Sequence, residues 1–338
     1  MALSISVIVP VYNSELTLPE LVHRVEPVLK VLAREYEIVL VNDGSRDQSW
    51  AIIQRLAAEK SIVRGINLMR NYGQHNALLC GIRAARYETV VTMDDDLQHA
   101  PEDIPKLIAK LEEGFDVVYG TPEREPHGLW RGLASKLTKF ALQRVMGVKL
   151  ARNVSAYRAL RTHLRVAFGR YQSPFVSLDV LLTWGTTRFA VITVPHHRRA
   201  AGKSNYTLRS LIIHALTLMT GFSVWPLQVA SAVGFGFTVF GILVFVYVVT
   251  RFLVEGRSVP GFPFLASLIA IFSGAQMFAL GIIGEYLARM HFRMMERPTY
   301  VVWESTDDQS EATPKPEPAN FSHGSTEGQP RDANRAVR

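Results

Sequence analysis

The sequence predicts an α/β doubly wound domain followed by two membrane-spanning helices. In the first 100 residues, short runs rich in Val and Ile alternate with longer helical stretches, a pattern typical of a parallel sheet covered by helices on both faces. Near the C-terminal end, two uncharged stretches are each long enough to cross a hydrocarbon core, which needs about 20 apolar residues. A chain of 338 residues, 48% of them hydrophobic, has room for both parts.

Four strand candidates are separated by segments of helical length: Ile5 to Val11, Glu37 to Val41, Val63 to Leu68 and Thr89 to Met93. In such sheets, ligands bind beyond the carboxyl ends of the strands. The residues that follow these strands are therefore the first candidates for a functional site, and they are Asn13, Glu15, Asp43, Arg70, Asn71 and Asp94 to Asp96. No basic residue precedes the apolar N-terminal run, so we expect a buried strand there and not a signal peptide.

Residues 119–195 have a mixed pattern that contains one further strand candidate, Phe189 to Val194. The formal net charge of +7 favours contact with polyanions such as lipid headgroups, phosphorylated substrates or nucleic acid. The single cysteine, Cys80, excludes an internal disulfide and a multi-cysteine zinc site, and it fits a reducing compartment such as the cytosol.

The composition changes after Tyr206. Residues 207–227 carry one formal charge and are expected either as amphipathic helices in the membrane interface or as an ordinary core helix. The spans Gln228 to Thr250 and Pro260 to Gly284 lie within a transmembrane hairpin at 228–287. Arginines crowd the far side of the second span, and two spans return the chain to the side it left. We therefore expect the domain 1–206 and the tail 288–338 on the cytoplasmic face of an inner (plasma) membrane.

The tail from about residue 304 is rich in Pro, Ser, Glu and Asn and has few aromatic residues. This composition predicts disorder.

Three consecutive carboxylates, Asp94, Asp95 and Asp96, follow the strand that ends at Met93. Along an extended chain, residues two apart share a face, so Asp94 and Asp96 converge while Asp95 points away. Two such carboxylates repel each other unless a cation lies between them, and Mg²⁺ or Mn²⁺ with substrate phosphates completing its shell meets that need. The alternative is an acidic turn that caps the helix beginning near Pro101.

Asp43 follows the second strand within Val41-Asn42-Asp43-Gly44-Ser45. Its carboxylate is placed to accept hydrogen bonds from a base or a ribose, although an Asn-Asp-Gly cluster is also an ordinary turn. No G-x-G-x-x-G or Walker motif follows the first strand, which argues against a dinucleotide site or a P-loop.

Four segments, in this order and spacing, resemble a known family: VIVPVYNSE (Val7 to Glu15), VNDGSRD (Val41 to Asp47), RNYGQHNA (Arg70 to Ala77) and MDDDLQ (Met93 to Gln98). They are similar to family 2 glycosyltransferases of the GT-A fold, a mixed doubly wound sheet. The resemblance is greatest to the enzymes that act on polyprenyl phosphates, which include dolichyl-phosphate mannose synthases and bacterial undecaprenyl-phosphate glucosyl and aminoarabinosyl transferases. The two C-terminal spans match the bacterial members.

The resemblance implies a metal-dependent, inverting transfer of a sugar from a nucleotide-sugar donor to a polyprenyl phosphate, with UDP favoured over GDP or dTDP. It implies that the nucleotide sugar is bound by Pro10, Tyr12, Glu15, Asp43 and Asp94, and that the metal, Mg²⁺ or Mn²⁺, is held by Asp94, Asp96 and Gln98. The family usually has a small residue between the two motif aspartates. Asp95 therefore adds a charge whose purpose the sequence does not reveal.

The membrane-facing stretch is preceded by a basic segment that contains Arg199, Lys203, Ser204 and Tyr206. It resembles the family's Arg-x-x-Gly-x-Ser-x-Tyr element beside the acceptor, and a guanidinium, an ammonium and a hydroxyl are suitable donors for a lipid phosphate. The alternative is a patch that only holds anionic lipid. Arg131 and Ser135 resemble a second element that contacts the acceptor phosphate, although a solvent-exposed basic helix explains them almost as well.

A phosphate monoester is largely dianionic at neutral pH and is already a nucleophile, so we expect no strong general base. Asp179 stands where hydroxyl-directed relatives keep their base. Here it is expected to position the donor sugar or to support a helix. The expected catalytic residues are thus Asp94, Asp96 and Arg199, with Asp179 as a weaker candidate.

Two other functions are less consistent with the sequence. A processive polysaccharide synthase needs a Gln-x-x-Arg-Trp element that the sequence lacks, and two spans make a poor translocation channel. A non-catalytic membrane scaffold is disfavoured because Asp43, Asp94, Asp96 and Arg199 are all present. We do not expect nucleic acid as a partner, because aromatic residues are not interleaved with the arginine clusters. The sequence leaves open which sugar is transferred and whether the chain forms a homo-oligomer.

Overall fold

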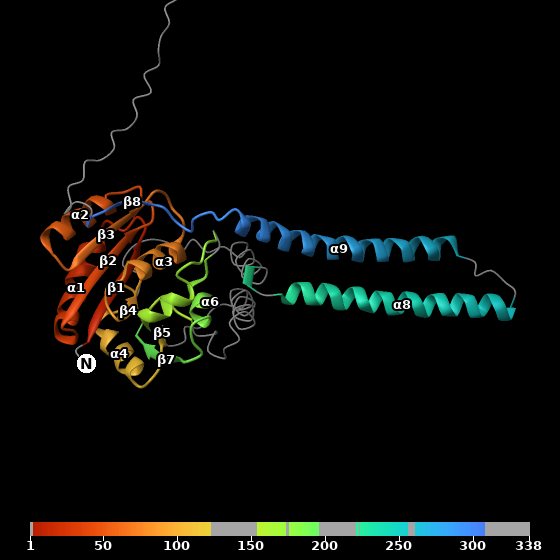
Figure 1. Cartoon of the computed structure of the whole chain (residues 1–338), viewed down its shortest axis with the longest axis horizontal. Helices are drawn as coiled ribbons and strands as arrows, with labels where there is room; N and C mark the ends of the chain where they lie inside the picture. Colours follow the sequence, from red (N-terminus) through yellow and green to blue (C-terminus); the bar gives the residue numbers. More distant parts are fainter. Residues whose placement is uncertain are drawn as a thin grey trace, which may run out of the picture.

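The protein is described from a computed structural model, which defines residues 3–122, 154–173, 176–195, 221–222, 224–255 and 261–307. Figure 1 shows a rounded α/β domain from which two long helices extend side by side. The expected architecture, an α/β domain with a mixed sheet followed by two long apolar helices, is confirmed.

The sheet has eight strands in the order β7-β5-β6-β4-β1-β2-β3-β8. In chain order the strands are β1 (Ser4–Val11), β2 (Glu35–Asn42), β3 (Val63–Leu68), β4 (Thr89–Thr92), β5 (Val117–Pro122), β6 (Arg158–Arg161), β7 (Phe189–Val194) and β8 (Val302–Ser305). The five strands expected from the Val and Ile runs are all present. Four of them pair in parallel around β1, whereas β6 runs antiparallel between β4 and β5 and makes the sheet mixed.

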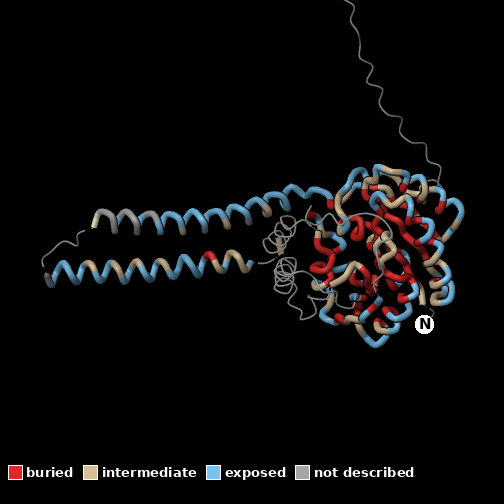
Figure 2. The backbone as a smooth tube through the Cα atoms, turned by 180° about the vertical axis from the view of Figure 1, so that it is seen from behind, coloured by how far each residue is buried: buried red, intermediate tan, exposed pale blue. Residues whose placement is uncertain are grey.

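Two apolar layers cover the sheet. Helices α1 (Leu18–Leu32), α2 (Ser49–Glu59) and α4 (Ile104–Glu112) pack on one face, and α3 (Gln74–Ala84) and α6 (Leu178–Thr183) pack on the other. Short 3-10 helices at Pro101–Asp103 (η1) and Thr162–Ala167 (η3) complete these layers. Because side chains alternate along a strand, Val7 and Val9 of β1 enter the first layer while Ile8 enters the second. Figure 2 shows the resulting buried centre of the domain.

The two long helices are α8 (Trp225–Glu255) and α9 (Phe262–Met294). Their candidate spans, Trp225–Val254 and Ile271–Met294, have mean hydropathies of 2.4 and 1.3 and no part of either window is buried inside the protein. A core helix of a soluble protein would be covered, but here large apolar side chains such as Phe245 and Leu253 are exposed. Most of both helices is coloured as exposed in Figure 2. Length, composition and exposure together make both helices candidate membrane spans.

The interfacial segment 207–227 lies mostly outside the described residues. Its last three residues, from Trp225, already belong to the first turn of α8. The proposal that the rest of this segment lies in the membrane interface therefore stays a prediction.

The prediction that the tail is disordered from about residue 304 is wrong for residues 304–307, which the structure orders. The chain after α9 returns to the domain and adds β8 antiparallel to the edge strand β3. Beyond the strand, Thr306 exchanges hydrogen bonds with Gly65, and Asp307 forms an ion pair with Arg64. Composition predicted disorder here because the pairing partner lies more than 230 residues away in the sequence. The residues after 307 lie outside the described part of the chain.

Candidate active site

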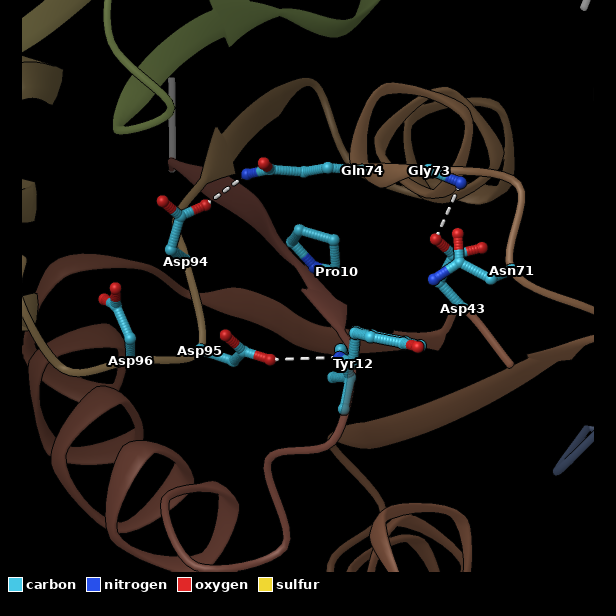
Figure 3. Close-up of a pocket in the computed structure, with 10 residues that line it drawn as sticks. Pro10, Tyr12, Asp43, Asn71, Gly73, Gln74, Asp94, Asp95 and Asp96 are labelled. Atoms are coloured by element: carbon cyan, nitrogen blue, oxygen red, sulfur yellow. Dashed lines mark hydrogen bonds between the residues drawn. The ribbon is translucent and has the colours of Figure 1, made fainter. Parts of the chain in front are cut away.

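A cavity of about 240 Å³ opens at the carboxyl ends of β1, β2 and β4. It is lined by residues at the end of β1, in the loops that follow these strands and β3, and at the start of α3, namely Pro10, Val11, Tyr12, Asp43, Asn71, Gly73, Gln74, Asp94, Asp95 and Asp96. Figure 3 shows the three consecutive aspartates on one side of this cavity and Asp43 on the other. The predicted residues Pro10, Tyr12, Asp43, Asp94 and Asp96 are thus brought together, at the sheet edge where parallel α/β domains bind ligands.

Asp94 and Asp96 have different neighbours. The Asp94 carboxylate accepts a hydrogen bond from the side-chain amide of Gln74 at 2.6 Å, and Asp96 accepts one from the backbone N–H of Gln98 at 3.1 Å. Leu97 between Asp96 and Gln98 has a φ of 60°, a left-handed conformation that turns the chain sharply after the aspartates. The side chain of Gln98, expected as a metal ligand, is not among the residues that line the cavity.

The structure shows what the Asp95 carboxylate contacts, which the sequence did not reveal. This carboxylate accepts hydrogen bonds from the backbone N–H of Tyr12 at 3.2 Å and from the hydroxyl of Ser14. These bonds join the loop after β1 to the loop after β4, and Figure 3 shows the bond from Tyr12. Burial raises the pKa of the Asp95 carboxyl, while the bonds from Ser14 and Tyr12 oppose that shift. Asp95 therefore fixes the two loops that form this side of the cavity.

Asp43 is buried, and both of its carboxylate oxygens receive a backbone N–H. Tyr72 donates at 2.7 Å and Gly73 at 2.8 Å. Burial raises the pKa of Asp43, and the two N–H donors act in the opposite direction. Each carboxylate oxygen has two acceptor sites, so the group is able to accept a further hydrogen bond from a ligand in the cavity.

Gly44 lets the Asp43 loop approach the loop after β3. Its φ is +68°, and a Cβ there would lie 2.4 Å from the backbone nitrogen of Asn71. Only glycine fits this left-handed position and this close approach. The Asn-Asp-Gly cluster is therefore both a turn and part of the cavity wall.

Glu15 and Asp179 lie outside the cavity lining. The carboxylate of Glu15 accepts the backbone N–H of Gln48 at 2.9 Å, just before α2 begins. Asp179 is 5% exposed and forms a buried ion pair with Arg158. It also accepts a hydrogen bond from the Tyr119 hydroxyl at 3.0 Å. These contacts support the structural alternative for Asp179, which holds α6 against the sheet.

The predicted acceptor residues lie outside the described part of the chain. They are Arg131, Ser135, Arg199, Lys203, Ser204 and Tyr206. Their contact with the acceptor phosphate stays a prediction.

Comparison with known proteins identifies the family. The model described as Glycosyl transferase family 2 matches residues 6–169. The undecaprenyl-phosphate 4-deoxy-4-formamido-L-arabinose transferase of Shewanella sediminis (strain HAW-EB3) is 38% identical over 301 residues, which cover 88% of this chain and 91% of that protein. The chain is a family 2 glycosyltransferase. A protein of the same description from Proteus mirabilis (strain HI4320) is 36% identical over 302 residues, which cover 88% of the transferase and 92% of that relative.

Among solved structures, the transferase is similar to glucosyl-3-phosphoglycerate synthase from Mycobacterium tuberculosis in complex with Mn²⁺, UDP and glucosyl-3-phosphoglycerate. The two chains are 21% identical with a TM-score of 0.49, and the match covers 64% of the transferase and 77% of that synthase.

The donor atoms in the cavity fit a hard divalent cation. Asp94 and Asp96 bring two carboxylates to one wall, and oxygen ligands of this kind suit Mg²⁺ and Mn²⁺. Among the residues that the structure describes, no group of three or more His, Cys, Asp and Glu side chains that could hold a metal ion is found.

Sequence reasoning assigned no role to Gln74 or Gly73 of the transferase, although both lie within the segment RNYGQHNA that carried part of the family resemblance. Gln74 reaches Asp94, and Gly73, with a φ of 95°, donates its N–H to Asp43. The sequence signal that pointed to these two residues was the position of the segment directly after β3. A pattern of residues does not reveal which neighbouring loop a side chain will contact.

Proposed function

We propose that this glycosyltransferase moves a 4-deoxy-4-formamido-L-arabinose residue from a nucleotide donor, with UDP as the favoured nucleotide, to undecaprenyl phosphate. The reaction takes place on the cytoplasmic face of the inner membrane and requires Mg²⁺ or Mn²⁺. The product is a lipid-linked pentose whose anomeric configuration is inverted relative to the donor.

The observation that carries the proposal is the extent of the similarity to the transferases of this description. The 38% identity extends over 88% of the chain, so it includes most of the membrane hairpin as well as the cavity. Domains that bind nucleotide sugars occur in enzymes with many different acceptors, so the domain alone does not identify the acceptor. The hairpin adds a lipid acceptor, because it holds the domain at the membrane surface where the phosphate of a polyprenyl chain lies.

The cavity supplies what the donor requires. Asp94 and Asp96 would hold the metal, which neutralises charge on the departing diphosphate when it is bound. Asp43, at the other side of the cavity, accepts hydrogen bonds from the base or ribose. Tyr12, 45% exposed, offers a ring and a hydroxyl along the cavity wall.

The acceptor needs little activation. The second pKa of a phosphate monoester is near 6, so its oxygen attacks the anomeric carbon without losing a proton to the protein. This agrees with the position of Asp179, whose pairing with Arg158 is a poor arrangement for a general base. Arg199 and its neighbours would hold the lipid phosphate in line with the donor. Restricting both substrates to one surface lowers the entropic cost of their encounter.

The test is transfer by the purified full-length chain. A panel of UDP-, GDP- and dTDP-linked sugars, including UDP-linked 4-deoxy-4-formamido-L-arabinose, would be offered with undecaprenyl phosphate and with undecaprenol. We expect one pentose donor to be preferred, a requirement for Mg²⁺ or Mn²⁺ that EDTA abolishes, and no product with undecaprenol. Asp96→Ala should remove transfer. A polymeric product would support the processive synthase, and binding of a donor without turnover would support the scaffold.

A further inference from the structure

A second cavity, of about 290 Å³, lies at the end of α9 nearest the domain. Arg289 and Arg293 line it together with Tyr286 and Met290 of the same helix, and Trp184 and Phe222 form the facing wall. Among the described residues, it shares no lining residue with the active-site cavity, and none of the residues assigned to the donor belongs to it.

The two arginines are held in place by surrounding groups. Arg289 pairs with Glu285 one turn earlier on α9 at 2.7 Å, and its side chain is 14% exposed. Arg293 donates to the backbone carbonyl of Gly221 at 3.0 Å and is hydrogen-bonded to Tyr171 of the domain. Two of the five guanidinium donors of Arg289 go to one carboxylate oxygen of Glu285, and guanidinium donors also match phosphate oxygens. The cavity therefore presents pre-positioned guanidinium groups to an anion.

The other walls are apolar. The Tyr171 ring stacks edge-on against Trp184, with ring centroids 5.5 Å apart, and lies 6.5 Å from the Phe222 ring. Trp184 is 50% exposed and Val224, also in the lining, is 60% exposed. Tryptophan and tyrosine are typical of the membrane–water interface, where one end of a side chain is apolar and the other is wet. A ligand that fills this cavity has a charged head and an apolar chain.

The depth of the cavity matches a lipid headgroup. The uncharged stretch of α9 ends at Gly284, and Arg289 follows five residues later. The hydropathy window of α9 extends to Met294, but its last part is charged, and at a helical rise of about 1.5 Å per residue Arg289 lies roughly 7.5 Å beyond the last uncharged residue. Basic residues at the end of a span are typical of the headgroup layer, which places the two arginines near lipid phosphates.

We propose that this cavity binds a lipid-borne phosphate, with Arg289 on the phosphate oxygens and the first apolar groups of the lipid against Trp184 and Phe222. Two lipids carry this chemistry: the polyprenyl phosphate acceptor and an anionic phospholipid of the bilayer. The first assignment rests on the proposed function and makes the cavity a loading position for the acceptor. The second does not depend on that function.

A short path joins the cavity to the active site. Trp184 directly follows α6, and the backbone N–H at the start of that helix, on Leu178, donates to Nδ1 of His75 at 3.3 Å. The residue before His75 is Gln74, which holds Asp94. Six helical residues span about 9 Å. Trp184 in the cavity lining is therefore one short helix away from α3, whose first residue holds Asp94.

The experiment is native mass spectrometry of the detergent-purified full-length chain with three probes: undecaprenyl phosphate, phosphatidylglycerol and undecaprenol. Arg289→Gln is compared with wild type and with Arg251→Gln, which removes the same charge from α8 near the opposite end of the hairpin. We expect Arg289→Gln to lower occupancy by a phosphate-bearing lipid about fivefold. Undecaprenol binding should not change. Arg289→Lys, which keeps the charge but loses the fork, should give an intermediate loss.

The outcomes distinguish the two lipids, and they distinguish failure of this cavity from failure of the proposed function. A loss confined to undecaprenyl phosphate identifies the acceptor, and a loss confined to phosphatidylglycerol identifies the bilayer. Equal retention by Arg289→Gln and Arg251→Gln, or an equal loss of undecaprenol, overturns the site. Because binding is read without turnover, a wild-type chain that binds lipid at Arg289 but transfers no sugar contradicts the proposed function alone. If Arg289→Gln does not fold, Arg289→Lys carries the comparison.

Discussion

The side-chain amide of Gln74 donates a hydrogen bond to a carboxylate oxygen of Asp94 across 2.6 Å. Gln74 is the first residue of α3, and Asp94 follows β4, so this bond orients the carboxylate from the start of a neighbouring helix. Gln74 thereby positions a proposed metal ligand without being a ligand itself. Residues around metal sites commonly have this role.

Replacing Gln74 by Glu should weaken metal-dependent transfer. The new carboxylate would lie beside Asp94 without a donor between them, so Asp94 loses its orientation and gains a repulsive neighbour. We expect the metal concentration needed for half-maximal activity to rise about 10- to 100-fold, with the maximal rate partly recovered at high Mn²⁺. Gln54→Glu on α2, which does not line the cavity, is the matched control. An unchanged metal requirement would contradict the positioning role.

Asp95 should tolerate replacement by Asn far better than Asp96 does. In Asp95→Asn the amide oxygen of the new side chain would still accept from Tyr12 and Ser14, so we expect a free energy of unfolding within ~1 kcal/mol of wild type and substantial transfer. Asp95→Ala leaves both donors without their acceptor and should cost about 1–3 kcal/mol. Asp96→Asn, in contrast, should fold normally and lose transfer. Thermal unfolding and activity measured on the same preparations distinguish the three. If Asp95→Asn were as inactive as Asp96→Asn, Asp95 would act on the substrate or the metal.

The sequence predicted the parallel part of the sheet because its Val and Ile runs are local signals that need no knowledge of partners. It also placed Asp43, Asp94 and Asp96 correctly at one edge, since the carboxyl ends of parallel strands meet there. It missed β5, β6 and β8. The strands β6 and β8 pair antiparallel with strands distant in the sequence, and β5 pairs with both β6 and β7.

The contacts of individual side chains were not predictable in the same way. Glu15 sits in a motif associated with nucleotide binding, yet its carboxylate satisfies the backbone N–H of Gln48. Asp179 looks like a free acid in the sequence, and only the fold brings Arg158 against it. Contacts of this kind depend on tertiary neighbours and are not encoded in local patterns.

Replacing Asp179 by Asn should affect stability more than chemistry. Arg158 is 1% exposed, and removing its partner leaves a buried charge, which typically costs about 3–5 kcal/mol. We expect a lower melting temperature, and we expect the double variant Arg158→Met/Asp179→Leu to recover much of it, because an apolar pair can replace a buried ion pair. Transfer by the stable double variant would exclude Asp179 as the base. A folded, stable and inactive Asp179→Asn would support a direct role in the reaction.

The C-terminal strand should make stability depend on pH through Asp307. Burial would raise the pKa of this carboxyl, but hydrogen bonds and charge from Arg64, with charge from Arg86, outweigh it and hold the pKa below its usual range. A lowered folded-state pKa means that the contribution is present above the unfolded pKa of about 3.9 and is lost as pH falls through the folded value. The melting-temperature difference between wild type and Asp307→Asn should therefore stay constant from about pH 7 to 5 and shrink toward about pH 3. The exposed Glu59→Gln serves as control, and a difference that grows on acidification would contradict the assignment.

The pairing of β8 with β3 fixes the membrane topology that we expect. Because both strands belong to one sheet, Trp303, which follows the hairpin, must lie on the same side of the membrane as the domain. Single cysteines would be introduced at Lys30 and Trp303, both exposed, and at Arg257 between the two spans. A membrane-impermeant maleimide added to intact spheroplasts should label position 257 at once and positions 30 and 303 only after lysis. The native Cys80 is 3% exposed, and burial raises the pKa of its thiol to about 12, so it contributes no background. Labelling of 303 before lysis, with 30 protected, would be incompatible with an eight-stranded sheet that contains the tail of the same chain.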